Sequence, residues 1–233
     1  MNKEIAILMA AGLGTRMRPI TDKTPKPLVK VHGTPMIETT INGLRKRGVD
    51  RIYVVVGYKK EQFSYLEEKY SNVVLIENKE YLEKNNISSL KAVDDILGSE
   101  DCFICEADLL ISDYSIFQGS YSRTCYFGRM VEGYSDDWIF EMKGDRITRV
   151  CKGGTDLYNM VGVSYWKKED AIVLRESIID SYKQAGHEEL FWDEIVDKEI
   201  ENIYVGIKPV TRKQIIEIDT CEELAAIDES YYL

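Results

Sequence analysis

The stretch of sequence that decides the fold is ILMAAGLGTRMRPITDKTPKPL, residues 7–28. It begins inside a short apolar run, residues 5–10, of the kind that forms a buried strand in a parallel sheet. Gly12 and Gly14 interrupt this run, and glycine tolerates the positive φ angles that a tight turn requires. The loop that follows carries four cations, Arg16, Arg18, Lys23 and Lys26. A buried strand, a glycine turn and clustered cations together predict an anion site, and a polyphosphate is the anion that suits it best.

Length and hydropathy limit the classes of protein to consider. The 233 residues fit one large α/β domain, and no linker rich in Pro, Gly or Ser divides them. The N-terminus has no apolar stretch of signal-peptide length, and no run of uncharged apolar residues is long enough for a membrane span. We therefore expect a cytoplasmic protein without a membrane partner.

The charge is unevenly distributed along the chain. The net charge of −10 argues against a nucleic-acid partner, which would need a basic surface. Residues 1–60 carry 12 Lys and Arg against 4 Asp and Glu, whereas residues 61–233 carry 18 against 36. This distribution suits a polyanionic ligand near the first part and a cationic one near the rest. Ordinary solvated faces would give the same totals, so charge alone leaves the function open.

Strand-like and helix-like segments alternate through residues 1–112. We expect strands at 5–10, 51–58, 73–77 and 102–107, and helices at 34–47, 59–70 and 88–97. Such alternation predicts a doubly wound parallel sheet, whose ligands bind at the carboxyl ends of the strands. The loops after Ala10 and Ala107 are therefore the expected places for chemistry.

The character of the sequence changes in residues 113–233. Strand-like segments at 123–131, 138–142, 146–151 and 161–166 predict a smaller, mixed sheet with a turn at 143–145. A helix is expected over 168–185, and Thr220 with Glu223 forms a capping box for a last helix. We predict a single α/β domain of Rossmann-like type, with a nucleotide-binding half (1–112) and a second half (113–233).

The loop after the first strand matches neither of two common phosphate-binding motifs. It lacks G-x-x-x-x-G-K-[ST], and Met17 stands where a dinucleotide fingerprint needs its third glycine. Instead it reads G-x-G-T-R-x-x-P-x-T-x-x-x-P-K from Gly12 to Lys26. This long motif resembles the signature of the nucleotidyltransferases that make sugar nucleotides, Rossmann-like enzymes that act on nucleoside triphosphates.

The resemblance implies roles for the residues of this loop. Arg16 would hold the β and γ phosphates as a two-pronged donor, and Lys26 would lie near the α-phosphorus as a point charge. Both are the expected catalytic groups. Glycine allows backbone N–H groups to approach phosphate oxygens closely. The expected nucleotide contacts are Ala10, Ala11, Gly12, Gly14, Thr15, Arg16, Asn86, Ser88 and Ala107.

Family members also use a metal ion, and this sequence offers carboxylates at two strand ends. CICEADLL places Asp108 after the fourth strand, and IIEIDT places Asp219 before the last helix. Mg²⁺ prefers one or two carboxylates together with phosphate oxygens and water. The resemblance implies that Asp108 and Asp219 bind Mg²⁺. Glu106 departs from the aspartate that is commoner in the family, and we do not count it as a direct ligand.

Further segments point to one branch of the family. NNISSL (85–90), DDWIF (136–140), VGVSYW (161–166) and LFWDEIV (190–196) resemble bacterial CTP:phosphocholine cytidylyltransferases. A quaternary ammonium donates no hydrogen bonds and is recognised by aromatic faces and nearby carboxylates. The expected acceptor-binding residues are Trp138, Tyr165, Trp192 and Asp193, although each tryptophan taken alone would more often belong to a core.

The resemblance implies transfer of CMP from CTP to phosphocholine, giving CDP-choline and pyrophosphate. The acceptor phosphate would attack in line, without a covalent intermediate. Alternative acceptors are 2-aminoethylphosphonate and a sugar phosphate, and a third alternative is a nucleotide-binding regulator without turnover. A primary ammonium would need carboxylates more than aromatic faces. The sequence leaves the oligomeric state open.

Overall fold

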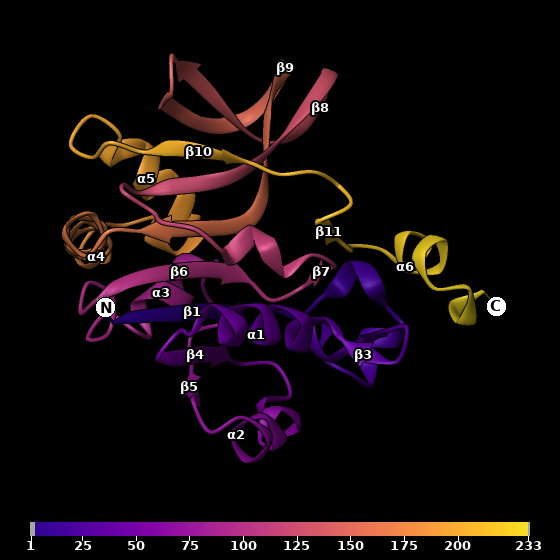
Figure 1. The fold of residues 1–233 in the computed structure, drawn as a ribbon. Helices are drawn as coiled ribbons and strands as arrows, with labels where there is room; N and C mark the ends of the chain where they lie inside the picture. Colours follow the sequence, from indigo (N-terminus) through magenta and orange to yellow (C-terminus); the bar gives the residue numbers. More distant parts are fainter. Residues whose placement is uncertain (1–2, 233) are drawn as a thin grey trace.

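A seven-stranded sheet with the order β10-β8-β9-β6-β1-β4-β5 forms the centre of the computed structural model, which describes residues 3–232 (Figure 1). Its strands are β1 (Glu4–Ala10), β4 (Arg51–Val56), β5 (Val73–Glu77), β6 (Asp101–Glu106), β8 (Cys125–Lys143), β9 (Arg146–Trp166) and β10 (Gly206–Pro209). The predicted α/β class with a mostly parallel central sheet is confirmed.

Four of these strands form the parallel half. β1 lies between β6 and β4, and β5 pairs with β4, all in parallel register. The connecting helices are α1 (Met36–Arg47), α2 (Tyr65–Lys69) and α3 (Ile87–Lys91). The last two are shorter than predicted: Lys60–Phe63 is a 3-10 turn before α2, and turns follow α3. Apolar spacing fixes which side is buried, but it does not distinguish a helix from successive turns.

Alternation along β1 divides the core between the two faces of the sheet. Ala6 and Leu8 pack with the buried face of α1, whereas Ile5 and Ile7 pack on the other face with α3, α4 (Lys168–Ser181) and α5 (Trp192–Glu199). Successive side chains of a strand point to opposite faces, so one residue step changes the layer. This rule decides below which predicted site residues reach the ligand cavity.

The second half extends the same sheet with an antiparallel ribbon. β9 pairs antiparallel with β6, and β8 and β9 form one long hairpin with its turn at 144–145. Ile139 pairs with both Cys151 and Asn159, because the ribbon folds back on itself. The four strands predicted here are therefore segments of two long ones, and the fold in the ribbon brings residues 136–138 and 152 to the ligand cavity.

Smaller elements complete the carboxyl end of the sheet. β7 (Leu109–Ile111) pairs antiparallel with β11 (Ile215–Glu217), and in Figure 1 the two lie above α1, with α6 (Cys221–Ile227) to their right. The predicted capping box is present, since the Thr220 hydroxyl accepts a hydrogen bond from the amide of Glu223. A further short pair joins β2 (Lys30–Val31) and β3 (Thr34–Pro35). No helix within residues 3–232 is both long enough and apolar enough to cross a bilayer.

Candidate active site

The loop that leaves β1 folds back onto itself. Gly14 has a φ of 63°, and a Cβ at this position would lie 2.8 Å from the Cβ of Lys26. The Thr21 hydroxyl donates a 2.8 Å hydrogen bond to the carbonyl of Gly14. A residue with a side chain would therefore be strained and crowded at this point. The glycine of the motif allows the two ends of the loop to meet, which brings Arg16 and Lys26 into one site.

Lys26 lies between two carboxylates from distant parts of the chain. Its ammonium donates to Asp108 at 2.6 Å and to Asp219 at 2.5 Å, and Arg16 donates to the same Asp219 oxygen at 2.8 Å. Burial by itself would lower the pKa of Lys26, but the attraction of Asp108 and Asp219 outweighs it, so its pKa lies above the ordinary value. The structure thus brings together all four residues that the sequence predicts for catalysis and metal binding.

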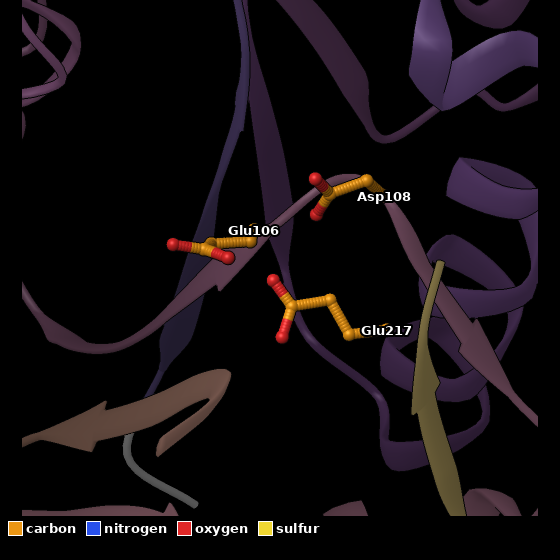
Figure 2. A group of neighbouring side chains, drawn as sticks. All are labelled: Glu106, Asp108 and Glu217. Carbon is orange, nitrogen blue, oxygen red and sulfur yellow. The ribbon is translucent and has the colours of Figure 1, made fainter. Parts of the chain in front are cut away.

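A second group of carboxylates lies beside this ion pair. Figure 2 shows Glu106 at the end of β6, Asp108 just after it, and Glu217 at the end of β11 as a group of neighbouring side chains. One oxygen atom from each lies within 4.8 Å of the others. Burial, followed by the charges of neighbouring acids, raises the pKa values of both Glu106 and Glu217. Such a group of acids favours a cation among them.

The donor set fits a hard divalent cation. Asp108 belongs both to the ion pair with Lys26 and to the group of three carboxylates, and its Oδ1 atom is buried without a hydrogen-bond partner among the described residues. All of the available ligand atoms are oxygens, the type that Mg²⁺ prefers. Sequence reasoning set Glu106 aside and gave Glu217 no role, although both sit two residues before a predicted ligand.

A cavity of about 580 Å³ opens at the carboxyl ends of the parallel strands, and a smaller one of about 270 Å³ adjoins it over the β1 loop. The larger has the usual size of a small-molecule site. The predicted nucleotide contacts Ala11, Gly12, Arg16, Asn86 and Ser88 line it, and Ala10, Gly12, Gly14, Thr15 and Arg16 line the smaller cavity. Ala107 lines neither, because its small side chain is buried in the core between the two acids.

Residues after β5 link the two ends of the larger cavity. Asn78 donates to the hydroxyl of Ser88 at 2.8 Å, and both side chains are buried. The side-chain oxygen of Asn86 accepts a 3.0 Å hydrogen bond from the backbone amide of Trp192. The NNISSL segment is therefore attached to the start of α5. The sequence did not identify Asn78, because a single asparagine after a strand carries no distinctive pattern.

The far end of the cavity combines aromatic and acidic side chains. Trp138 and Phe191 line it with ring centroids 5.5 Å apart, and Asp193 is 1% exposed there. The hydroxyl of Tyr126 donates to Asp193 at 2.9 Å. Burial raises the pKa of Asp193 to about 7. Trp138 and Asp193 thus occupy the predicted region, and Phe191 supplies an aromatic ring that we did not predict.

Two of the predicted acceptor-binding residues do not line the cavity. Trp192 is 3% exposed and packs in the core against Tyr126 and Trp166. Tyr165 lies on the opposite face of the sheet, where its hydroxyl is within hydrogen-bond distance of two alternative acceptors, Glu4 at 3.0 Å and Asp101 at 3.1 Å. The prediction was wrong for both, since Phe191 takes the place of its neighbour Trp192 and strand alternation turns Tyr165 away.

Comparison with known proteins agrees with this geometry. Residues 5–123 match the model of the nucleotidyl transferase family. A 2-aminoethylphosphonate cytidylyltransferase from Lancefieldella rimae is 56% identical over 98% of this chain and 94% of its own length. A choline-phosphate cytidylyltransferase from Streptococcus pneumoniae is 34% identical over 96% of both chains. The solved structure of a CTP:phosphocholine cytidylyltransferase from Streptococcus pneumoniae superposes with a TM-score of 0.91 at 32% identity, covering 99% of this chain and 100% of the other.

Proposed function

Because this chain belongs to the nucleotidyl transferase family, we propose that it transfers CMP from CTP to 2-aminoethylphosphonate and releases pyrophosphate. The observation that carries the proposal is the 56% identity, over nearly the whole chain, to a cytidylyltransferase with that acceptor. Phosphocholine, the acceptor that we expected from the sequence, becomes the second candidate, supported by relatives of 34% and 32% identity.

The acceptor end of the cavity supports a primary ammonium. An ammonium of this kind has three N–H donors, and the buried Asp193 and the partly buried Glu106 line the same cavity as the two aromatic rings. A sugar phosphate carries no cation to offset these acids. A nucleotide-binding regulator would have no need to hold Lys26 between Asp108 and Asp219.

The reaction needs no covalent intermediate with the protein. A phosphonate oxygen of the acceptor attacks the α-phosphorus of CTP as the bond to the bridging oxygen of pyrophosphate breaks. A phosphate group has its second pKa at about 6, and a phosphonate is similar enough to be largely dianionic at neutral pH. The attacking group therefore arrives ionised, and no general base is required.

The protein's contribution is then to position the reactants and to stabilise developing charge. Arg16, 68% exposed at the mouth of the smaller cavity, is placed to bind the β and γ phosphates as a forked donor. Lys26 is held in place before the substrate binds, so its charge needs little reorganisation when charge builds up near the α-phosphorus.

We propose Mg²⁺ as the cofactor. Asp108 would hold it, with Asp219 or Glu217 as the second protein ligand. When bound, the ion supplies positive charge to the phosphate oxygens. Removing it with EDTA is expected to abolish turnover.

The proposal is tested by measuring pyrophosphate release for four nucleoside triphosphates against a panel of acceptors. We expect CTP to be strongly preferred, and 2-aminoethylphosphonate to give a higher kcat/KM than phosphocholine, phosphoethanolamine or glucose 1-phosphate. Comparable turnover with UTP or dTTP would overturn the choice of nucleotide. A higher kcat/KM for phosphocholine would overturn the choice of acceptor.

A pH dependence follows from the buried Asp193. Its pKa of about 7 means that it is largely protonated at lower pH, where it attracts an ammonium group only weakly. As the pH rises through neutrality Asp193 ionises, so the KM for 2-aminoethylphosphonate is expected to fall by several-fold between about pH 6 and about pH 8. Initial rates across this range measure the effect.

Asp193→Asn separates this effect from the titration of the acceptor's own phosphonate. The variant should have a raised KM for 2-aminoethylphosphonate. Its KM should no longer show the part of the pH dependence that arises from Asp193, whereas the part that arises from the phosphonate remains. Because a carboxylate with a raised pKa destabilises the fold once it ionises, the melting temperature of the variant at about pH 8 should equal or exceed that of the wild type. An unchanged pH profile of KM in the variant would contradict the prediction.

A further inference from the structure

Lys152 lies at the aromatic end of the cavity, directly across the ribbon from Trp138. The two residues are cross-strand partners in β9 and β8. The Lys152 ammonium is 5.2 Å from the centre of the Trp138 ring and 4.7 Å from the centre of the Phe191 ring. Both distances fall within the range in which a cation is attracted to an aromatic face. The Lys152 ammonium therefore lies against both aromatic rings.

Within the described residues, the Trp138 and Phe191 rings are the interaction partners that we find for the Lys152 ammonium. Lys84, the other lysine that lines the cavity, is by contrast paired with Glu80. The Trp138 and Phe191 rings meet at 67°, so they form two walls of one corner. A trimethylammonium group depends on such walls, because it has no N–H to donate to the nearby acids. A ligand with that group would have to displace Lys152 or share the corner with a like charge.

We propose that Lys152 determines acceptor specificity by filling the Trp138–Phe191 corner and so disfavouring a trimethylammonium group relative to a primary ammonium. This inference rests on the proposed function. A primary ammonium is affected less, since it can donate to the carboxylates of Asp193 and Glu106 without using the rings. Lys152 would thus favour 2-aminoethylphosphonate over phosphocholine without contacting the reacting phosphorus.

The test compares kcat/KM for the two acceptors in wild-type protein, Lys152→Met and Lys152→Arg, with CTP saturating. Methionine keeps the length of the side chain but removes the charge. We expect the ratio of kcat/KM for phosphocholine to that for 2-aminoethylphosphonate to rise at least ~10-fold in Lys152→Met, mainly through a lower KM for phosphocholine. Arginine keeps a cation over the rings, so Lys152→Arg should retain most of the wild-type preference.

Lys143→Met is the matched control, because Lys143 is exposed at the far end of the same ribbon and the substitution changes the net charge equally. The ratio of kcat/KM for phosphocholine to that for 2-aminoethylphosphonate should be the same in Lys143→Met as in the wild type. An unchanged ratio in Lys152→Met, or an equal loss with both acceptors, would overturn the role of Lys152 while leaving the proposed function intact. A wild-type preference for phosphocholine would overturn the proposed function itself, whatever the variants do.

Discussion

Lys26→Met is expected to lower kcat with CTP and 2-aminoethylphosphonate by at least ~100-fold, a loss of about 2.7 kcal/mol of transition-state stabilisation. The ammonium of Lys26 is fixed by two hydrogen bonds, so it is placed in advance where charge develops. Methionine preserves the aliphatic part of a side chain that is only 9% exposed, but it removes the charge. Single-turnover rates at saturating substrate measure the effect on the chemical step.

Lys23→Met is the control for this experiment. Lys23 lies in the same loop and carries the same charge, but its side chain is exposed and lines neither cavity. Its kcat should stay within about twofold of the wild type. Because Lys26→Met leaves Asp108 and Asp219 without their shared cation, its melting temperature should be measured in the presence of Mg²⁺. A folded Lys26→Met protein with near-normal kcat would contradict the assigned role.

The part of the site that could be predicted from the sequence is the part that a contiguous motif specifies. Gly14, Arg16 and Lys26 belong to one loop, and the position of that loop follows from the apolar strand before it. Asp108 could also be placed, because it follows another buried strand, and parallel strands end at the same edge of a sheet. Local sequence determines such positions through turn geometry and strand direction.

The aromatic end could not be predicted in the same detail, because it depends on how separate segments pack. Trp192 and Phe191 are neighbours, and only the start of α5 decides which ring enters the core and which lines the cavity. Tyr165 could have been rejected by alternation along its strand. It is one residue before Trp166, which packs on the face that carries the cavity residues.

The sequence contains part of the information that is needed to place Lys152 in the site. The predicted turn at 143–145 implies a hairpin, and its register places residue 152 opposite Trp138. This pairing says nothing of Phe191, which comes from a loop 39 residues further along the chain. Lys152, Trp138 and Phe191 come together because the ribbon folds back, and this fold depends on the second pairing of Ile139. No local pattern of apolar residues predicts that pairing.

Asp108→Asn is expected to lower kcat by at least ~100-fold and to raise the concentration of Mg²⁺ needed for half-maximal activity. Asp108 is the one residue of the described site that both accepts from Lys26 and belongs to the group with Glu106 and Glu217. The amide is nearly the same size as the carboxylate, so packing should be preserved. It lacks the negative charge, however, and so holds both Mg²⁺ and the Lys26 ammonium less well. Titration of activity with Mg²⁺ measures both changes.

Two further variants test whether the effect is specific to Asp108. Asp180→Asn removes an exposed carboxylate of α4, remote from both cavities, and should leave kcat and the Mg²⁺ requirement unchanged. Glu217→Gln tests the neighbouring acid, whose pKa is raised by burial and by Asp108, and it should have a smaller effect because Glu217 has no contact with Lys26 in the structure's described ion pairs. Near-normal turnover of Asp108→Asn would contradict the role assigned to Asp108, and wild-type turnover that persisted in EDTA would contradict the role assigned to a divalent cation.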